Sequence, residues 1–312
     1  YSVQLKNTLD QLSADIGSGR ISWGELTKKG SVAFAQEVSN ISKSSFSNME
    51  QNFHEYSGLI YDGAFSEHIT SKEKRGLTGD NIDEQKAQEI AKKFIGEDKV
   101  QEITSTGKSE NTNMPTFDFS VKVNGETNSN MVISISEKGG HVVFMNYNRD
   151  IQAESVTQER ADEIGKDFLK SRGFDDMKET YYLKQDGIVT INYAYEQDGV
   201  TVYPDLIKLK VALDNGEIMG IETTGYLNSH EKRNISDVKI TKEQAKKDLN
   251  SKIEILSENL AIIPTEWKTE VLCWEFKGKV DDTDFLVYIN AKTGEEQDIL
   301  VITNTPNGTL TH

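Results

Sequence analysis

Three segments of this sequence begin in the same way, and this repetition constrains the fold more than any other feature. Each begins with a short polar run followed by an alanine, at Ala87, Ala161 and Ala245, so the starts lie 74 and 84 residues apart. Apolar residues three or four positions apart follow each alanine, which predicts an amphipathic helix. Similar units at an interval of this size indicate a tandem repeat.

Strand signals follow each predicted helix. Apolar and polar residues alternate over 117–123, 207–213 and 285–289, as in strands with one buried face. A turn with glycine then precedes one last apolar run in each copy. Glycine suits such a turn because it adopts positive φ without strain. The three turns are 137–140, 214–217 and 291–295.

We therefore predict an α+β protein in which three tandem helix-on-antiparallel-sheet modules follow a helical segment. The helical segment carries an apolar stripe that includes Leu5, Leu9 and Leu12, and a hairpin of two helices would bury it. The polar stretches 70–83 and 226–237 are predicted to be protease-sensitive linkers. The predicted parts are a helical segment at 1–79 and modules at 80–155, 156–236 and 237–312.

The charge distribution supports this division and limits the partners. The net charge is −16, of which each predicted module contributes −5 and the helical segment −1. So acidic a chain does not suit a nucleic-acid binder or an anchor on anionic lipid, because both need clustered cations. It would instead steer a basic partner at low salt. The apolar runs are too short for a transmembrane helix.

Several fragments imitate a catalytic motif. S-x-x-K begins at Ser71, Ser105 and Ser229, and K-T-G begins at Lys292. Together they are typical of a penicillin-binding site, where a serine attacks and a lysine tunes it. S-D-N is missing, the serines fall outside predicted helix starts, and the K-T-G is a predicted hairpin turn. We therefore interpret these fragments as chance matches.

The remaining titratable residues do not indicate a site either. No two histidines show the i, i+4 spacing of a helical zinc pair. Paired acids at 175–176, 281–284 and 295–296 suit solvated turns better than a glycosidase pair or a calcium loop. Cys273, the one cysteine, lies between two apolar residues on a predicted strand, which favours a buried structural thiol and excludes an intrachain disulfide. No catalytic, metal or cofactor site is predicted. The histidines are His54, His68, His141, His230 and His312.

Five stretches carry a resemblance to known families. They are 225–233 with His230 and Arg233, 262–266, 271–278, 288–296 and 306–311. The copies resemble PepSY repeats, and three in tandem behind a helical segment resemble the C-terminal part of the YpeB family of spore-germination proteins. The resemblance covers roughly residues 83–312.

This resemblance implies a fold of PepSY modules that act as regulatory or inhibitor-like binding units. It implies one partner, the cortex-lytic enzyme SleB, and a location on the outer side of the inner spore membrane, facing the cortex. Membrane attachment would come only from an upstream segment, because the family's membrane-spanning segment is absent from this chain.

Three functions stay open at this point. A non-catalytic protein that controls or stabilises SleB is favoured, because the sequence assembles no reaction centre. The alternatives are a peptidoglycan hydrolase in its own right and a structural spacer between spore membrane and cortex. Release of muropeptides from cortex fragments would identify the hydrolase. A spacer should tolerate the deletion of one copy, whereas a binding module should not.

Overall fold

The computed structural model describes Phe65 and residues 74–312 except 111, 113, 127–128, 266, 268, 306–307 and 312. The chain divides into two compact units, 1–60 and 61–312. The first unit lies outside the described residues, so the helical hairpin predicted for 1–79 stays a prediction. The second unit is mostly antiparallel sheet with a few helices, in agreement with the predicted α+β class.

The first predicted module begins with a helix. Asp83 caps this helix by accepting a hydrogen bond from the Lys86 amide at 2.8 Å. The small side chains of Ala87 and Ala91 are fully buried, which lets the helix lie close to the sheet. The elements are α5 (Glu84–Ile95), β1 (Val100–Ser109), β2 (Thr116–Val123), β3 (Asn130–Ser136) and β4 (Val142–Asn148).

The second predicted module has a similar helix and strands. Thr157 caps its helix, and Ala161 and Leu169 are buried against the sheet. A short helix, α7 (Thr224–Ser229), follows the last strand. The main elements are α6 (Gln158–Ser171), β5 (Met177–Gln185), β6 (Ile188–Gln197), β7 (Val200–Ala212) and β8 (Ile218–Glu222).

The third predicted module differs in its helix. The apolar residues that follow Ala245, up to Ile253, predict a longer helix, but α8 covers only Lys242–Ala245 and a 3₁₀ turn ends at Asp248. The Asn250 side chain accepts a hydrogen bond from the Lys252 amide, a local bond that competes with helix continuation. Ile253 still packs on the sheet. The strands are β9 (Glu254–Pro264), β10 (Glu270–Val280), β11 (Thr283–Asn290), β12 (Glu296–Thr305) and β13 (Gly308–Thr311).

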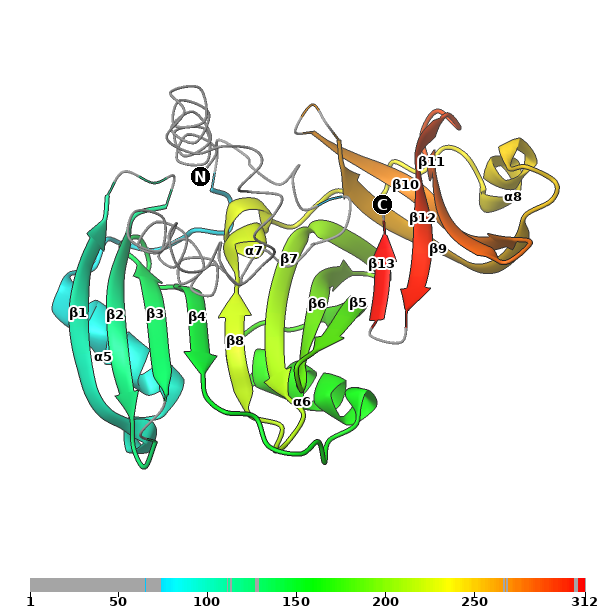
Figure 1. Ribbon diagram of the computed structural model, residues 1–312. Helices are drawn as coiled ribbons and strands as arrows, with labels where there is room; N and C mark the ends of the chain where they lie inside the picture. The colour runs from blue at the N-terminus through cyan, green and yellow to red at the C-terminus, as the bar shows by residue number, and fades with distance from the viewer. Residues whose placement is uncertain are drawn as a thin grey trace, which may run out of the picture. The chain divides into compact units, whose positions relative to one another are not determined.

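The strands that the structure describes all belong to one 13-stranded sheet (Figure 1), in the order β1-β2-β3-β4-β8-β7-β6-β5-β13-β12-β11-β10-β9. Strands β4 and β8 join the first two predicted modules, with Met145 opposite Ile221. Strand β9 also pairs in parallel with β7, and β13 meets β5 at Leu183. Strands β5–β7 and β9–β13 therefore form a closed ring, so the predicted modules share backbone hydrogen bonds.

Two large hydrophobic clusters hold this unit together. One lies beneath α5 and α6 and contains Phe119, Ile133 and Tyr193. The other lies where β7 meets β10 and β11, and it contains Tyr203, Tyr288 and Phe65. Phe65 is 3% exposed and reaches this second cluster from a position ahead of α5 in the chain. Phe65 is thus tied to the strand ring.

The linker predicted for 226–237 is wrong in its first part. Residues through Ser229 belong to α7, and Leu227, Asn228 and Ser229 are buried. The buried Leu227 gives this polar-looking stretch an apolar contact that fixes it to the fold. By contrast, the positive φ predicted for the turn glycines is confirmed at Gly139, Gly216 and Gly294.

Candidate functional site

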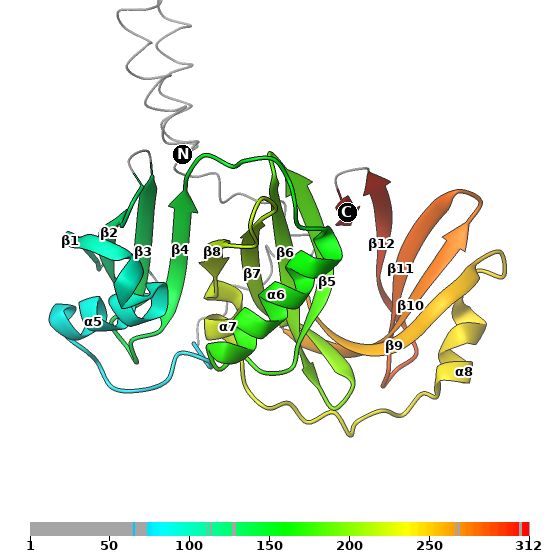
Figure 2. The ribbon, with the colours of Figure 1, turned by 90° about the horizontal axis from the view of Figure 1, so that it is seen from below.

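Helices α5 and α6 pack against the same face of the joined sheet (Figure 2). Their C-terminal turns meet through Phe94 and Phe168, whose rings lie 5.7 Å apart in an edge-to-face arrangement. Such aromatic pairs favour edge-to-face geometry because of the ring quadrupole. The two helices leave a hollow between them above the line where β4 pairs with β8.

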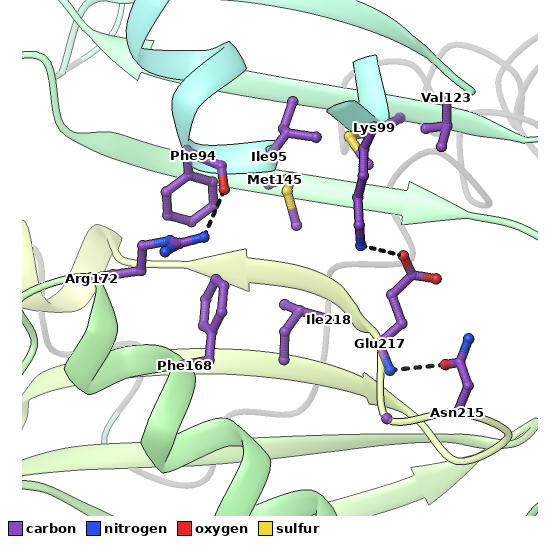
Figure 3. Close-up of a pocket in the computed structure, with 12 residues that line it drawn as sticks. Phe94, Ile95, Lys99, Val123, Met145, Phe168, Arg172, Asn215, Glu217 and Ile218 are labelled. Carbon is purple, nitrogen blue, oxygen red and sulfur yellow. Dashed lines mark hydrogen bonds and ion pairs between the residues drawn. The ribbon is translucent and has the colours of Figure 1, made fainter. Parts of the chain in front are cut away.

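We call this hollow the seam groove (Figure 3). Its volume is about 530 Å³. Its floor is apolar and is buried except at the half-buried Ile218, and its walls are the half-buried rings of Phe94 and Phe168. A concave site of this size with an apolar lining and few polar groups is typical of ligand-binding sites. The floor residues are Val123, Met131, Met145 and Ile218.

One end of the seam groove carries an arginine held by the two rings. The Arg172 guanidinium lies 5.2 Å from the ring centroid of Phe94 and 4.9 Å from that of Phe168. Its Nη2 donates a hydrogen bond of 2.9 Å to the carbonyl oxygen of Phe94, at the end of α5. Arg172 is exposed, and it forms no ion pair with the described residues. This end of the groove is therefore cationic.

The other end is electrically balanced. Lys99 binds Glu217 across the groove at 2.9 Å, and Arg149 Nε binds the same carboxylate at 3.0 Å. Arg149 also forms two hydrogen bonds with Asp214, at 2.7 and 2.9 Å. The hydrogen bonds from Arg149 lower the pKa of Asp214 to about 2. The two cations here are thus neutralised by two carboxylates.

A second cluster of charges lies away from the seam groove, and we call it the buried ion cluster (Asp205, His230, Arg233 and Glu270). Arg233 binds both oxygens of Asp205, at 2.6 and 2.7 Å, and both oxygens of Glu270, at 3.0 and 3.1 Å. Arg75 also pairs with Glu270. Burial alone would lower the pKa of Arg233, but the bonds with Glu270 and Asp205 outweigh it and raise that pKa.

The pair His230 and Asp205 is the part of this cluster that most resembles a catalytic dyad. Nδ1 of His230 lies 2.7 Å from Asp205 Oδ2. The same carboxylate is already held by Arg233, and the imidazole stacks on Tyr226 with ring centroids 4.0 Å apart. No hydroxyl or thiol of the described residues is hydrogen-bonded to His230. The arrangement suits a structural tie between β7, β10 and the segment after α7.

The motif fragments lie on different elements. Ser105 is on strand β1, Ser229 is buried in α7, and Lys292 in the β11–β12 turn binds Asp237 at 2.8 Å. Ser71 lies outside the described residues. The penicillin-binding motif is therefore not assembled from the three fragments that the structure describes.

The other titratable residues flagged in the sequence are placed individually. Nε2 of His141 lies 2.8 Å from the carbonyl oxygen of Thr78, while His54, His68 and His312 lie outside the described residues. Cys273 is fully buried, and burial raises its pKa to about 12, so the thiol is unreactive. Among the described residues, no group of three or more metal-ligating side chains is arranged to hold an ion. In the same part of the chain, no helix is both long and apolar enough to cross a membrane.

Sequence reasoning missed most of both sites. It singled out His230 and Arg233 but not Asp205, Glu270 or Arg172. Asp205 gave one local signal, because it interrupts a long apolar stretch of β7 in which a charge needs a partner. Nothing local marks Arg172, whose environment depends on two helices that are distant in sequence.

Comparisons with known proteins agree with this architecture. Residues 42–236 match the family described as YpeB sporulation, PepSY1 and PepSY2 domains. Residues 239–300 match the family described as peptidase propeptide and YPEB domain. The solved structure of the Bacillus megaterium YpeB C-terminal domain is similar, with a TM-score of 0.65 and 28% sequence identity, over 72% of this chain and 100% of that one.

Two curated relatives are similar over nearly the whole chain. Sporulation protein YpeB of Bacillus subtilis is 30% identical over 310 residues, which are 97% of this chain and 68% of that protein. Sporulation protein YpeB of Halalkalibacterium halodurans is 27% identical over 303 residues, which are 96% of this chain and 66% of that protein. The chain thus spans about two thirds of the length of these relatives.

Proposed function

Because the chain belongs to the YpeB family of sporulation proteins, we propose that it is a non-catalytic regulatory protein of spore germination. Its partner would be the cortex-lytic enzyme SleB, which it would control or stabilise through its PepSY-like modules. We further propose that these modules are three helix-on-sheet units and that the protein lies on the outer side of the inner spore membrane, attached by an upstream segment. The relatives are named sporulation proteins, which supports the setting.

One observation carries the non-catalytic part of the proposal. In the buried ion cluster, Asp205 and Glu270 are already bound by Arg233. A general base or nucleophile must present an oxygen to a substrate, whereas both oxygens of each carboxylate are bound to Arg233 and Asp205 is completely buried. The cluster therefore supports a structural role in which it ties β7 to β10.

The net charge of −16 favours a basic partner. We expect the purified chain to bind purified SleB in isothermal titration calorimetry, with affinity that falls when NaCl rises from about 50 to about 500 mM, since salt screens exposed charges. Lysozyme, a basic protein, is the control for non-specific attraction. Failure to bind SleB at low salt would refute the proposed partner.

The alternative of a hydrolase is tested separately. The chain alone, incubated with cortex fragments, should release no muropeptides, while SleB in the same assay supplies the positive control. Release by the pure chain would overturn the non-catalytic assignment. A spacer is distinguished by removing residues 237–312, because a spacer should tolerate the loss and a binding protein should lose affinity for SleB.

A further inference from the structure

We propose that the seam groove receives a short apolar segment of a protein partner and that Arg172 binds a carboxylate carried by that segment. This inference rests on the proposed function, because it takes the occupant to be part of a protein. It names the contact surface and the chemistry of the segment that the surface accepts.

The groove floor suits side chains of more than one shape. Met131 and Met145 are buried at its base, and methionine side chains adapt to different partners because they are unbranched and polarizable. Ile218 and the rings of Phe94 and Phe168 complete an apolar surface that a partner's aliphatic or aromatic side chain would cover. Burying that surface would favour association by the hydrophobic effect.

The charge at the groove's end selects the polar part of the ligand. Arginine has five N–H donors, and Arg172 uses Nη2 on the Phe94 carbonyl oxygen at 2.9 Å, with a long contact of 3.5 Å from Nη1 to Ser171. The two rings hold the guanidinium plane in place, which reduces the entropy lost on binding a carboxylate. The arginine at the opposite end, Arg149, is already saturated by Asp214 and Glu217.

The backbone around the groove determines the mode of binding. Strands β4 and β8 pair with each other beneath it, with Phe144, Met145 and Asn146 opposite Glu222, Ile221 and Gly220. A partner therefore cannot add a strand at this line through main-chain hydrogen bonds. Recognition must come from side chains inserted between the helices, as when a helix or loop docks in a groove.

The test uses the intact chain and two peptide sources. Fluorescein-labelled 15-residue peptides that overlap along SleB, and a displayed library of random 12-residue peptides, are measured against wild type, Arg172→Gln and Arg172→Lys. Arg160→Gln is the matched control, because Arg160 lies on α6, the helix that Arg172 directly follows, but is 61% exposed and paired with Glu163. Unfolding midpoints establish that each variant is folded.

We expect bound peptides to combine an apolar side chain with a nearby Asp or Glu. Arg172→Gln should weaken them by about tenfold or more, Arg172→Lys by less, and Arg160→Gln by under twofold. Replacing the peptide's own carboxylate with an amide should lower its affinity for wild type by the same factor. The same replacement should not lower its affinity for Arg172→Gln any further. This peptide-side change leaves the protein intact, so it decides the question even if an Arg172 variant is destabilised.

Three results would overturn the inference, and they separate it from the proposed function. If intact SleB binds the chain but neither Arg172→Gln nor the amide peptides change affinity, the groove assignment is wrong and the proposed function stands. If SleB does not bind, the random peptide library alone tests the seam groove. Enrichment of peptides without a carboxylate would then refute the proposed role of Arg172. A dimer in sedimentation velocity that Arg172→Gln dissociates would assign the groove to a second copy and overturn the proposed occupant.

Discussion

Arg233 holds Asp205 through two hydrogen bonds of 2.6 and 2.7 Å, and Asp205 is completely buried. The same guanidinium binds Glu270, so one side chain connects β7 with β10. Only 7% of the Arg233 side chain is exposed. Asp205 and Glu270 therefore share the Arg233 guanidinium, and Arg75 is a second cation for Glu270. This shared cation makes the junction testable.

Replacing Arg233 with Met should lower the free energy of unfolding by about 3–5 kcal/mol, because it leaves Asp205 buried without its arginine and Glu270 with Arg75 as its cation. The double variant Arg233→Met with Asp205→Asn should lose less than the sum of the two single losses, since the pair acts as a unit. Urea unfolding measures all four proteins of this cycle. Arg160→Met, in an exposed pair, should cost under about 1 kcal/mol. If the loss in the double variant equalled the sum of the two single losses, Arg233 and Asp205 would not act as a unit.

Gly165 allows α6 to approach β6 closely. A Cβ at this position would lie 2.3 Å from the Tyr193 hydroxyl oxygen and 3.1 Å from Leu209 Cδ2. At an ordinary helix position Gly→Ala gains about 1 kcal/mol, but here we expect a loss of about 1–3 kcal/mol from overpacking. Adding Tyr193→Phe should recover part of that loss. The exposed Asp167→Ala is the control, and a stabilised Gly165→Ala would refute the close approach.

Glu179 on β5 faces Asp162 on α6, with Gln158, Lys166 and Tyr193 around the pair. Burial, and then the charge of Asp162, raise the pKa of Glu179 to about 7. The folded state thus keeps a proton that the unfolded chain releases near its ordinary pKa of 4.5, so stability should fall as pH rises from about 4.5 to 7.

After a discount for solvent screening, we expect this loss to be about 1–2 kcal/mol between pH 5 and 8. Glu179→Gln should remove that part of the pH dependence and be more stable than wild type at pH 8. Urea unfolding between pH 5 and 8 measures the free energy of unfolding of each protein. Glu196→Gln, on an exposed carboxylate paired with Lys178, should follow the wild-type curve. If Glu179→Gln left the pH dependence of stability unchanged, Glu179 would not hold a proton in the folded state at these pH values.

Phe65 fills a space between Tyr203 and Tyr288, with ring centroids 5.3 Å from each. Phe65→Ala should lower the free energy of unfolding by about 3–5 kcal/mol, because it removes buried apolar surface and leaves a cavity. Phe65→Leu should cost less, and Trp267→Ala, at a position that is 86% exposed, should cost under about 0.5 kcal/mol. Near-UV circular dichroism would report the change around the two tyrosines. A Phe65→Ala variant as stable as wild type would place this ring outside the core.

The parts of the fold that sequence reasoning predicted depend on local rules. The starts of α5 and α6, the strand positions of β2, β7 and β11, and the glycine turns all follow from capping, periodicity and backbone freedom. Strand β1 was missed because it lies at the edge of the sheet with most of its residues exposed, so it lacks an apolar alternation. Helix α8 was overestimated because Asn250 forms a local side-chain bond instead of continuing the helix.

By itself, the sequence determined the repeated helix and strand pattern, the acidic charge and the burial of Cys273, because each depends on neighbours within a few residues or on simple counts. Only the tertiary structure decided that β4 pairs with β8 and that Asp205 meets Arg233. It also brought Arg172 over the rings of Phe94 and Phe168. These contacts join segments that lie far apart along the chain, so their free energy arises only when packing brings the segments together.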